Sequence, residues 1–287
     1  RGARAMETIL LTPDDEAEAI VSSFTIPPCP DVLIQVLREM RQEDPDVVRI
    51  GNLITGDVSL AAAVLKTVNS PAFGLQTKAK SVDQAVKLMG LRNVKDITTG
   101  LLLRDSLPPG NAAVLDNFWD TSAAVAQTAA LVARPLAKLD RDDAYTFALF
   151  RDCGIPLMAR RFDDYDKAFV AGLATAPSVT AAEASRFGVE HARIGATVAK
   201  TWFLGDDLTT AIRLHHEYAT LRTAPVPASV RRLVALALMA ETIHARCTRQ
   251  ADSEEWARGG SFACDVLEID EDAIIEQQDM VEGILGF

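Results

Sequence analysis

Three of the four histidines in this chain could bind a metal ion together with nearby carboxylates. His215 and His216 are adjacent in RLHHE, His191 lies in VEHARIGATVAKTW, and Asp152 and Glu241 stand beside or within apolar runs. Imidazole and carboxylate donors from separate helices suit manganese, iron, magnesium or nickel better than a soft metal. Each residue alone also has a structural explanation: a buried histidine can bond a backbone carbonyl, and an aspartate before Cys-Gly can cap a turn.

The adjacent histidines restrict where such a cluster can lie. Neighbouring residues of a helix point about 100° apart, so His215 and His216 can face one centre only at a helix end or inside a bundle. A helix that begins near Asp206 and Asp207 places both histidines late in that helix.

Other catalytic patterns are missing from the sequence. There is no GxSxG elbow, no GxxxxGK[ST] loop and no GxGxxG loop. The four cysteines form no CxxC pair, which argues against a structural zinc site and a disulfide framework. We expect free thiols in a reducing cytosol, and therefore a cytoplasmic protein.

Composition excludes several kinds of partner. The chain has 287 residues, of which 48% are hydrophobic, enough for one large domain or two modest ones. Its net charge of −11 disfavours nucleic acid and anionic membranes, because both carry negative charge. No apolar run approaches the ~20 residues that span a bilayer, and the N-terminal segment does not fit a signal peptide. We expect neither a nucleic-acid nor a membrane partner.

Helix start and stop signals recur along the chain, whereas period-two strand patterns do not, so the predicted class is all-α. Pro30-Asp31, Asp44-Pro45 and Asp57 are expected to open helices. Ser81 with Gln84, and Thr180 with Glu183, are expected to form capping boxes. Gly90 and Gly188 should end helices, and Asn69 should adopt a left-handed cap conformation before Pro71.

Two proline-rich segments, at 106–111 and 222–227, indicate soft boundaries. The acidic segment from residue 252 onward has regularly spaced apolar residues, which predicts a docked amphipathic helix rather than a disordered tail.

The N-terminal half resembles the HDOD family. The likeness is carried by a proline-rich start, a DPD helix opening, an NSP turn and a final glycine, and it continues through Phe118-Trp119 and Arg151-Asp152 to His215-His216-Glu217. Its signature positions here are Pro28, Pro30, Asp57, Asn69, Ser70, Pro71 and Gly90. The resemblance implies a two-lobed helical bundle with an HD-like C-terminal lobe. It places the HDOD domain at 21–222, with lobes at about 21–106 and 111–222. Residues 1–20 would then be a helical extension or a cloning remnant, and 223–287 a C-terminal helical extension.

HDOD domains resemble HD-type metal phosphohydrolases that have lost metal ligands. By that likeness, the first histidine of the HD pattern falls at Thr121 and the His-Asp pair at Arg151-Asp152. His191, His215 and His216 match histidines of the HD-GYP branch, and Glu241 stands near the final aspartate. Two ligand positions are thus lost, one of them to a guanidinium that repels metals and competes for Asp152. We therefore expect these residues to be remnants, with no metal and no cofactor bound.

A buried Arg151–Asp152 contact could supply the charge balance that a metal once gave. This hypothesis fails if Arg151 points to solvent. No GYP motif follows His216 and Glu217, which argues against cyclic di-GMP hydrolysis.

The leading interpretation is a non-catalytic bacterial signal-transduction module that acts through a signalling protein partner. A surface between the two lobes is the first candidate for docking. One alternative is a residual metal-dependent phosphohydrolase acting on a nucleotide or cyclic dinucleotide. Another is a nucleotide-binding sensor without turnover, which a positively lined pocket near Arg151 would favour.

Overall fold

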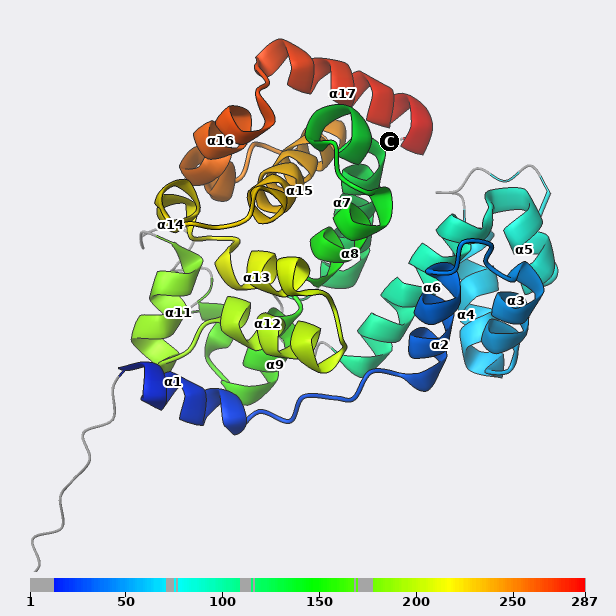
Figure 1. Ribbon diagram of the computed structural model, residues 1–287, viewed down its shortest axis with the longest axis horizontal. Coiled ribbons are helices and arrows are strands. Elements are labelled where there is room, and N and C mark those ends of the chain that lie inside the picture. The colour runs from blue at the N-terminus through cyan, green and yellow to red at the C-terminus, as the bar shows by residue number, and fades with distance from the viewer. Residues whose placement is uncertain are drawn as a thin grey trace, which may run out of the picture.

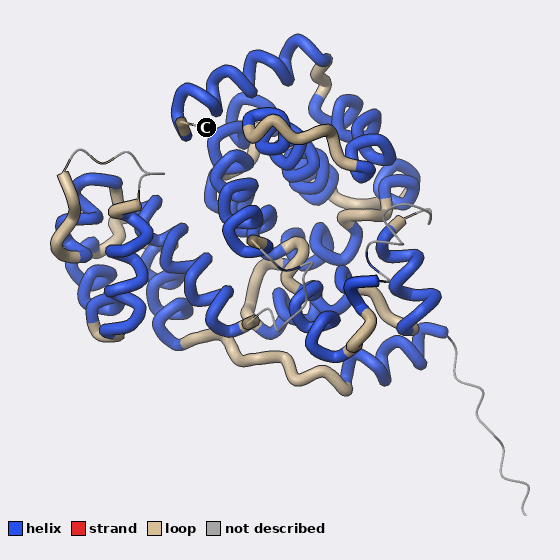
Figure 2. Tube along the Cα trace, turned by 180° about the vertical axis from the view of Figure 1, so that it is seen from behind, coloured by secondary structure: helices blue, strands red, loops and turns tan. Residues whose placement is uncertain are grey.

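The chain folds entirely into helices. The structure, a computed structural model, describes residues 13–70, 75, 77–108, 115, 117–167, 169 and 178–286. Within these ranges every regular element is a helix and none is a strand (Figures 1 and 2). The predicted all-α class is confirmed.

The helices form two lobes, and the smaller one lies at the right of Figure 1. It contains α2 (Asp31–Met40), α3 (Val47–Thr55), α4 (Val58–Val68), α5 (Val82–Met89) and α6 (Leu91–Ser106). Apolar residues at helical spacing turn inward and form its core, among them Leu33, Val36, Ile50, Ile54 and Val64.

The larger lobe is built around one long apolar helix. Its elements are α7 (Phe118–Val132), the π-helical turn η3 (Ala133–Ala137), α8 (Arg141–Phe150), α9 (Gly154–Arg161), α11 (Val179–Phe187), α12 (His191–Thr201), α13 (Asp206–Leu214), α14 (Tyr218–Thr223), α15 (Ala228–Cys247), α16 (Glu254–Leu267) and α17 (Glu271–Leu285). Helix α15 packs against α7, α8, α13, α16 and α17. The C-terminal helices therefore complete the core of this lobe.

The segment from residue 252 onward docks as an amphipathic structure, as predicted. Helix α17 buries Ile274 and Val281 and packs on α15 and α7. Its acidic residues face outward, so the docked face is apolar and the solvent face is charged.

The N-terminal helix α1 (Pro13–Ser22) packs on α12 of the larger lobe, although an extended segment then leads to α2 in the smaller lobe (Figure 1). That segment is held where the Trp202 indole Nε1–H donates to the Pro27 carbonyl at 2.9 Å. The beginning of the chain thus crosses both lobes.

The lobes also meet where α6 contacts the start of α8. Arg141 donates to the Asp96 carboxylate at 2.8 Å, and the Tyr145 hydroxyl donates to the Asp96 carbonyl at 2.9 Å. Lys95 is only 3% exposed and pairs with Asp96 and Asp142. Since buried charges are stable only when paired, this polar contact fixes α8 against the smaller lobe.

Most local start and stop signals are confirmed. Asp57 accepts from the Leu60 amide at 3.0 Å and caps α4, and Ser81 accepts from the Gln84 amide at 3.1 Å and caps α5. Gly90 ends α5 at φ +85, a conformation that favours glycine. Pro30 precedes α2 as its N-cap residue.

Three local predictions were wrong. Helix α3 is capped by Asp46 rather than opened at Asp44, because the Asp46 carboxylate reaches the Arg49 amide. Helix α11 is capped by Ser178, which accepts from the Ala181 amide, so Thr180 and Glu183 form no capping box.

Asn69 is the third correction, because its φ of −85 is not left-handed. Its side-chain amide instead donates to the Ala79 carbonyl at 2.8 Å and accepts from the Ala79 amide at 2.7 Å. Asn69 therefore clamps the far end of the α4–α5 connection. Pro71, which follows Ser70, lies outside the described residues.

We expect Asn69→Ala to lower the free energy of unfolding by about 1–3 kcal/mol, because two backbone groups of Ala79 lose their partner. Urea unfolding followed by circular dichroism measures the change. Asn52→Ala, at an exposed position of α3, should change stability by less than ~0.5 kcal/mol. Equal effects of the two substitutions would contradict the clamp.

Among the described residues, no single helix is long and apolar enough to cross a membrane. Helices α3 and α4 satisfy that test only as a pair, and they meet at a bend of 111°.

Candidate metal centre and buried arginine

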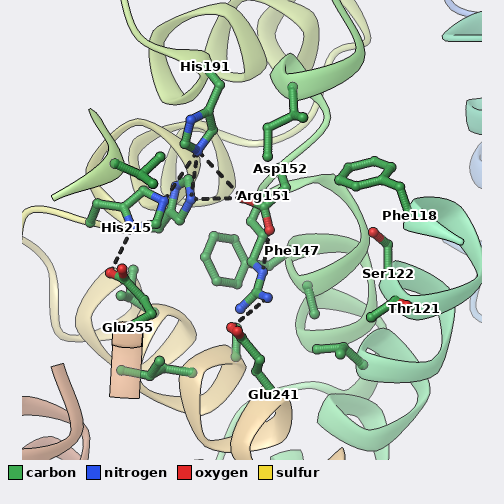
Figure 3. A pocket seen from close by; sticks show the side chains of 18 of the residues that line it. Phe118, Thr121, Ser122, Phe147, Arg151, Asp152, His191, His215, Glu241 and Glu255 are labelled. Carbon is green, nitrogen blue, oxygen red and sulfur yellow. Dashed lines mark hydrogen bonds and ion pairs between the residues drawn. The ribbon is translucent and has the colours of Figure 1, made fainter. Parts of the chain in front are cut away.

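Four of the predicted site residues converge on one point of the larger lobe (Figure 3). Asp152, His191, His215 and His216 each offer a ligand atom, and these four atoms lie within 4.8 Å of one another. His191 Nε2 lies 3.4 Å from His215 Nε2 and 3.2 Å from His216 Nε2. Asp152 Oδ1 lies 3.2 Å from His215 Nε2 and 3.5 Å from His191 Nε2.

Helix ends bring these side chains together. Asp152 occupies the turn between α8 and α9, and His191 is the first residue of α12. Helix α13 stops at Leu214, so His215 and His216 follow its last turn and both reach the cluster. The two histidines thus satisfy the condition set by helix geometry, because they lie just beyond the end of the helix rather than within it.

Close backbone packing of α9 on α12 sets the position of His191. A Cβ on Gly154 would lie 2.1 Å from the His191 carbonyl oxygen and 2.9 Å from the Gly195 amide nitrogen. Only a residue without a side chain allows this approach.

We expect Gly154→Ala to lower the free energy of unfolding by at least about 1–3 kcal/mol, because the methyl group would force the two helices apart. Gly283→Ala is the matched control: it lies within α17 and its Cβ would meet nothing within 4 Å, so it should be neutral or stabilising. Urea unfolding of both variants measures the difference. A Gly154→Ala variant with the same free energy of unfolding as the natural sequence would refute the tight contact.

A partner on Nδ1 orients each imidazole ring. His191 Nδ1 lies 2.8 Å from a Glu183 carboxylate oxygen, and His216 Nδ1 lies 2.7 Å from Glu255. His215 Nδ1 lies 2.7 Å from the Ile212 carbonyl oxygen. All three partners are acceptors, so Nδ1 carries the proton and the Nε2 lone pairs point into the cluster.

The Nε2 lone pairs of the three histidines and the Asp152 carboxylate repel one another unless a metal ion or a proton lies between them. Four of the six separations between the donor atoms are 3.2–3.5 Å, which is the edge length of a tetrahedron whose metal–donor bonds are about 2.0–2.2 Å. Asp152, His191, His215 and His216 therefore fit a single metal ion, which would hold the four segments together and act as a Lewis acid. The expectation from the sequence that no metal is bound is not tested by the structure, and the geometry of these four donors favours the opposite expectation.

Without a metal ion, a proton on His191 supplies the positive charge within the cluster. Burial lowers the pKa of His191, but the Glu183 and Asp152 carboxylates outweigh burial and raise that pKa to about 10. Burial and the neighbouring His216 lower the pKa of His215 to about 4. One ring is thus cationic and another neutral at pH 7.

Arg151 occupies the other side of Asp152. Its side chain is 13% exposed and donates from Nε to Asp152 Oδ2 at 3.0 Å and from Nη2 to Glu241 Oε2 at 2.8 Å. Burial disfavours the guanidinium charge, but Glu241 and Asp152 outweigh it and raise the pKa of Arg151 above its ordinary value. Arg151 does not point to solvent, so the charge-balance hypothesis passes its structural test.

Asp152 therefore faces two cationic positions at once. Oδ1 faces the histidines and Oδ2 accepts from Arg151. Although burial raises the pKa of Asp152, Arg151 and the histidines hold it well below its usual range. The Asp152 carboxylate therefore bridges the cluster of potential metal ligands and the Arg151 guanidinium.

The remaining predicted residues lie around a cavity of about 300 Å³ that adjoins the cluster. Thr121 lines it from α7, and Glu241 pairs with Arg151 rather than with the histidines. Phe118 and Ser122 form part of the wall opposite His191 and His215, and Phe147 also lines the cavity (Figure 3).

The sequence interpretation missed the residues that support the histidines. Glu183 is 1% exposed and accepts from His191 and from the Tyr165 hydroxyl. Glu255 accepts from His216 and from the Tyr218 hydroxyl. The sequence pattern places Glu183 in a capping box with Thr180 and makes Glu255 one of several acidic residues at a helix start, so no local signal indicates that either residue contacts a histidine.

A model of the HDOD domain matches residues 26–218. The chain therefore belongs to the HDOD domain family.

Two curated proteins that match part of this chain are longer than it is. It is 28% identical over 202 residues to an uncharacterized protein of Treponema pallidum, a match that covers 67% of this chain and 37% of the relative. It is 34% identical over 61 residues to the uncharacterized protein YuxH of Bacillus subtilis, covering 21% of this chain and 15% of the relative. The matches thus span well under half of either relative.

Solved structures share the fold. A protein of Marinobacter aquaeolei VT8 named for signal transduction superposes with a TM-score of 0.74 at 19% identity, covering 96% of this chain and 63% of that one. An HDOD domain protein of Geobacter sulfurreducens and a protein of Shewanella amazonensis SB2B named as a phosphohydrolase each give 0.68 at 19% identity. These two matches cover 94% of this chain and 97% and 95% of the others. At this identity the likeness concerns the fold.

Proposed function

We propose that this chain is a regulatory module of bacterial signal transduction whose HD-type site holds one metal ion structurally and performs no turnover. The observation that carries the proposal is the division of the Asp152 carboxylate between the histidine cluster and the buried Arg151 guanidinium. Arg151 takes the place that a second cation would need, and a guanidinium neither activates water nor acts as a Lewis acid.

The donor set supports a structural ion. Structural zinc sites are closed by four protein ligands, whereas catalytic sites keep a position for water. Asp152 and the three histidines supply four donors, so a tetrahedral ion bound by all of them would have no open position.

The charge around the cavity disfavours a phosphate substrate. Apart from the histidines, Arg151 is the one cationic residue among its described lining residues, and Asp152 and Glu241 neutralise it. Glu255 adds a further carboxylate, and its pKa is lowered to about 2 because hydrogen bonds from His216 and Tyr218 outweigh burial. Before any metal ion is counted, the side chains that line the cavity carry no net positive charge, which weakens the alternative of a metal-free nucleotide sensor.

The output of such a module is contact with a signalling protein. The name of the Marinobacter structure supports a role in signal transduction, and the junction of α6 with α8 gives a partner access to both lobes at once. We keep the surface between the lobes as the candidate docking region.

A hydrolysis assay tests the absence of turnover. Untagged protein loaded with Mn²⁺, Fe²⁺ or Zn²⁺ is incubated with bis-p-nitrophenyl phosphate, mononucleotides and cyclic di-GMP. We expect rates equal to those of Asp152→Ala. A metal-dependent rate that His215→Ala abolishes would overturn the proposal.

A residual single-metal phosphohydrolase is the second candidate. The observation that favours it is the cavity beside the donors, since a six-coordinate ion such as Mn²⁺ would keep two positions for water or substrate. It predicts hydrolysis with Mn²⁺ or Fe²⁺ but none with Zn²⁺, and the same assay separates the two functions.

A further inference from the structure

Two tyrosine–glutamate–histidine arrangements flank the cluster. In the first, Glu183 accepts from the Tyr165 hydroxyl and from His191 Nδ1, which lies 2.8 Å from one of its oxygens. Glu183 also accepts the backbone N–H of His191 at 2.9 Å. One buried carboxylate on α11 thus fixes both the ring and the first residue of α12.

The second arrangement repeats the pattern from different helices. Glu255, in the first turn of α16, accepts from the Tyr218 hydroxyl at 2.6 Å and from His216 Nδ1 at 2.7 Å. Glu255 is 8% exposed, so little water competes for these bonds. The third ring, His215, has only the neutral Ile212 carbonyl as its Nδ1 acceptor.

We propose that Glu183 and Glu255 are positioning residues that hold His191 and His216 in the tautomer required to bind the metal ion. The inference rests on the metal binding in the proposed function. Each carboxylate accepts the Nδ1 proton and so leaves Nε2 as the donor atom, and its negative charge makes the imidazole a stronger ligand. The tyrosine hydroxyl also donates to the carboxylate, in the case of Glu255 to the same Oε1 that accepts from His216, and so fixes the orientation of the carboxylate.

Histidine ring nitrogen NMR tests the tautomers without metal activity. The chain has four histidines, so the spectrum of ¹⁵N-labelled protein in excess chelator is simple to assign through His→Asn variants. We expect Glu255→Leu to remove the Nδ1–H preference of His216 and to leave His215 unchanged. An unchanged His216 signal in folded Glu255→Leu would overturn the proposal.

Metal affinity provides the second readout. Competition of Co²⁺ with a chromophoric chelator should give a Kd about 10–100-fold weaker for Glu255→Leu than for the natural sequence. Glu255→Gln keeps an acceptor without the charge and should recover part of the loss. Glu254→Gln, at the exposed neighbouring position, should bind as the natural sequence does.

Glu183 needs a gentler variant, because it also caps α12. Tyr165→Phe keeps the carboxylate and removes one hydroxyl bond, and we expect a smaller loss of Co²⁺ affinity with an unchanged helical spectrum. Equal Kd values for Glu255→Leu, Tyr165→Phe and the natural sequence would contradict the positioning role. If the natural sequence binds no Co²⁺, the metal site of the proposed function fails, and the NMR experiment alone decides the tautomer claim.

Discussion

Arg151→Met should lower the free energy of unfolding by about 3–5 kcal/mol, because it leaves two carboxylates facing a site without their cation. Asp152 and Glu241 are 22% and 28% exposed, and both accept from Arg151. The methionine fills similar volume, so the loss reports charge rather than packing. Urea unfolding in excess chelator measures it without any contribution from bound metal.

Two further variants make the result specific. Removing Glu241 as well, in Arg151→Met with Glu241→Leu, should restore part of the stability, since one unpaired carboxylate disappears. Arg160→Met, at an exposed position of α9, should change stability by less than ~0.5 kcal/mol. An Arg151→Met variant as stable as Arg160→Met would show that the buried pair does not balance charge.

His215→Ala should abolish tight metal binding, because the ring supplies one of four donors and faces two of the others across 3.2–3.4 Å. We expect bound Mn²⁺ or Zn²⁺ after gel filtration to fall from about one equivalent to below about a tenth of one. The same loss is expected for His191→Ala. Metal analysis of the filtered protein gives the ratio.

The fourth histidine provides the control. His244 lies on α15 and is not among the four clustered donors, so His244→Asn should retain the metal. Retention by His215→Ala, or loss by His244→Asn, would place the metal elsewhere.

Local signals in the sequence predicted much of the fold. Asp57, Ser81 and Gly90 act through bonds and dihedral angles within a few residues, so their roles were accessible from spacing alone. Asn69 was misassigned because its side chain bonds Ala79, across a connection whose path the sequence does not specify. Competing caps explain the other errors: Asp46 and Ser178 lie two residues from the expected positions.

The sequence identifies individual residues of the candidate site but not how they group in space. Adjacent histidines at a helix end and a carboxylate on an apolar helix identified His215, His216 and Glu241 from periodicity. Their grouping with distant residues is a tertiary property. The sequence therefore does not reveal the roles of Glu183 and Glu255, although both carboxylates lie within hydrogen-bonding distance of a histidine ring, as that of Asp152 does.

The proposed function requires that one metal ion and one arginine share Asp152. The metal content of untagged, freshly purified protein, measured by inductively coupled plasma mass spectrometry after incubation with Mn²⁺, Fe²⁺ or Zn²⁺, decides whether they do. We predict about one equivalent of metal per chain. Two equivalents would mean that Arg151 does not take a cation's place, and less than about a tenth of an equivalent would mean that the four donors hold only a proton.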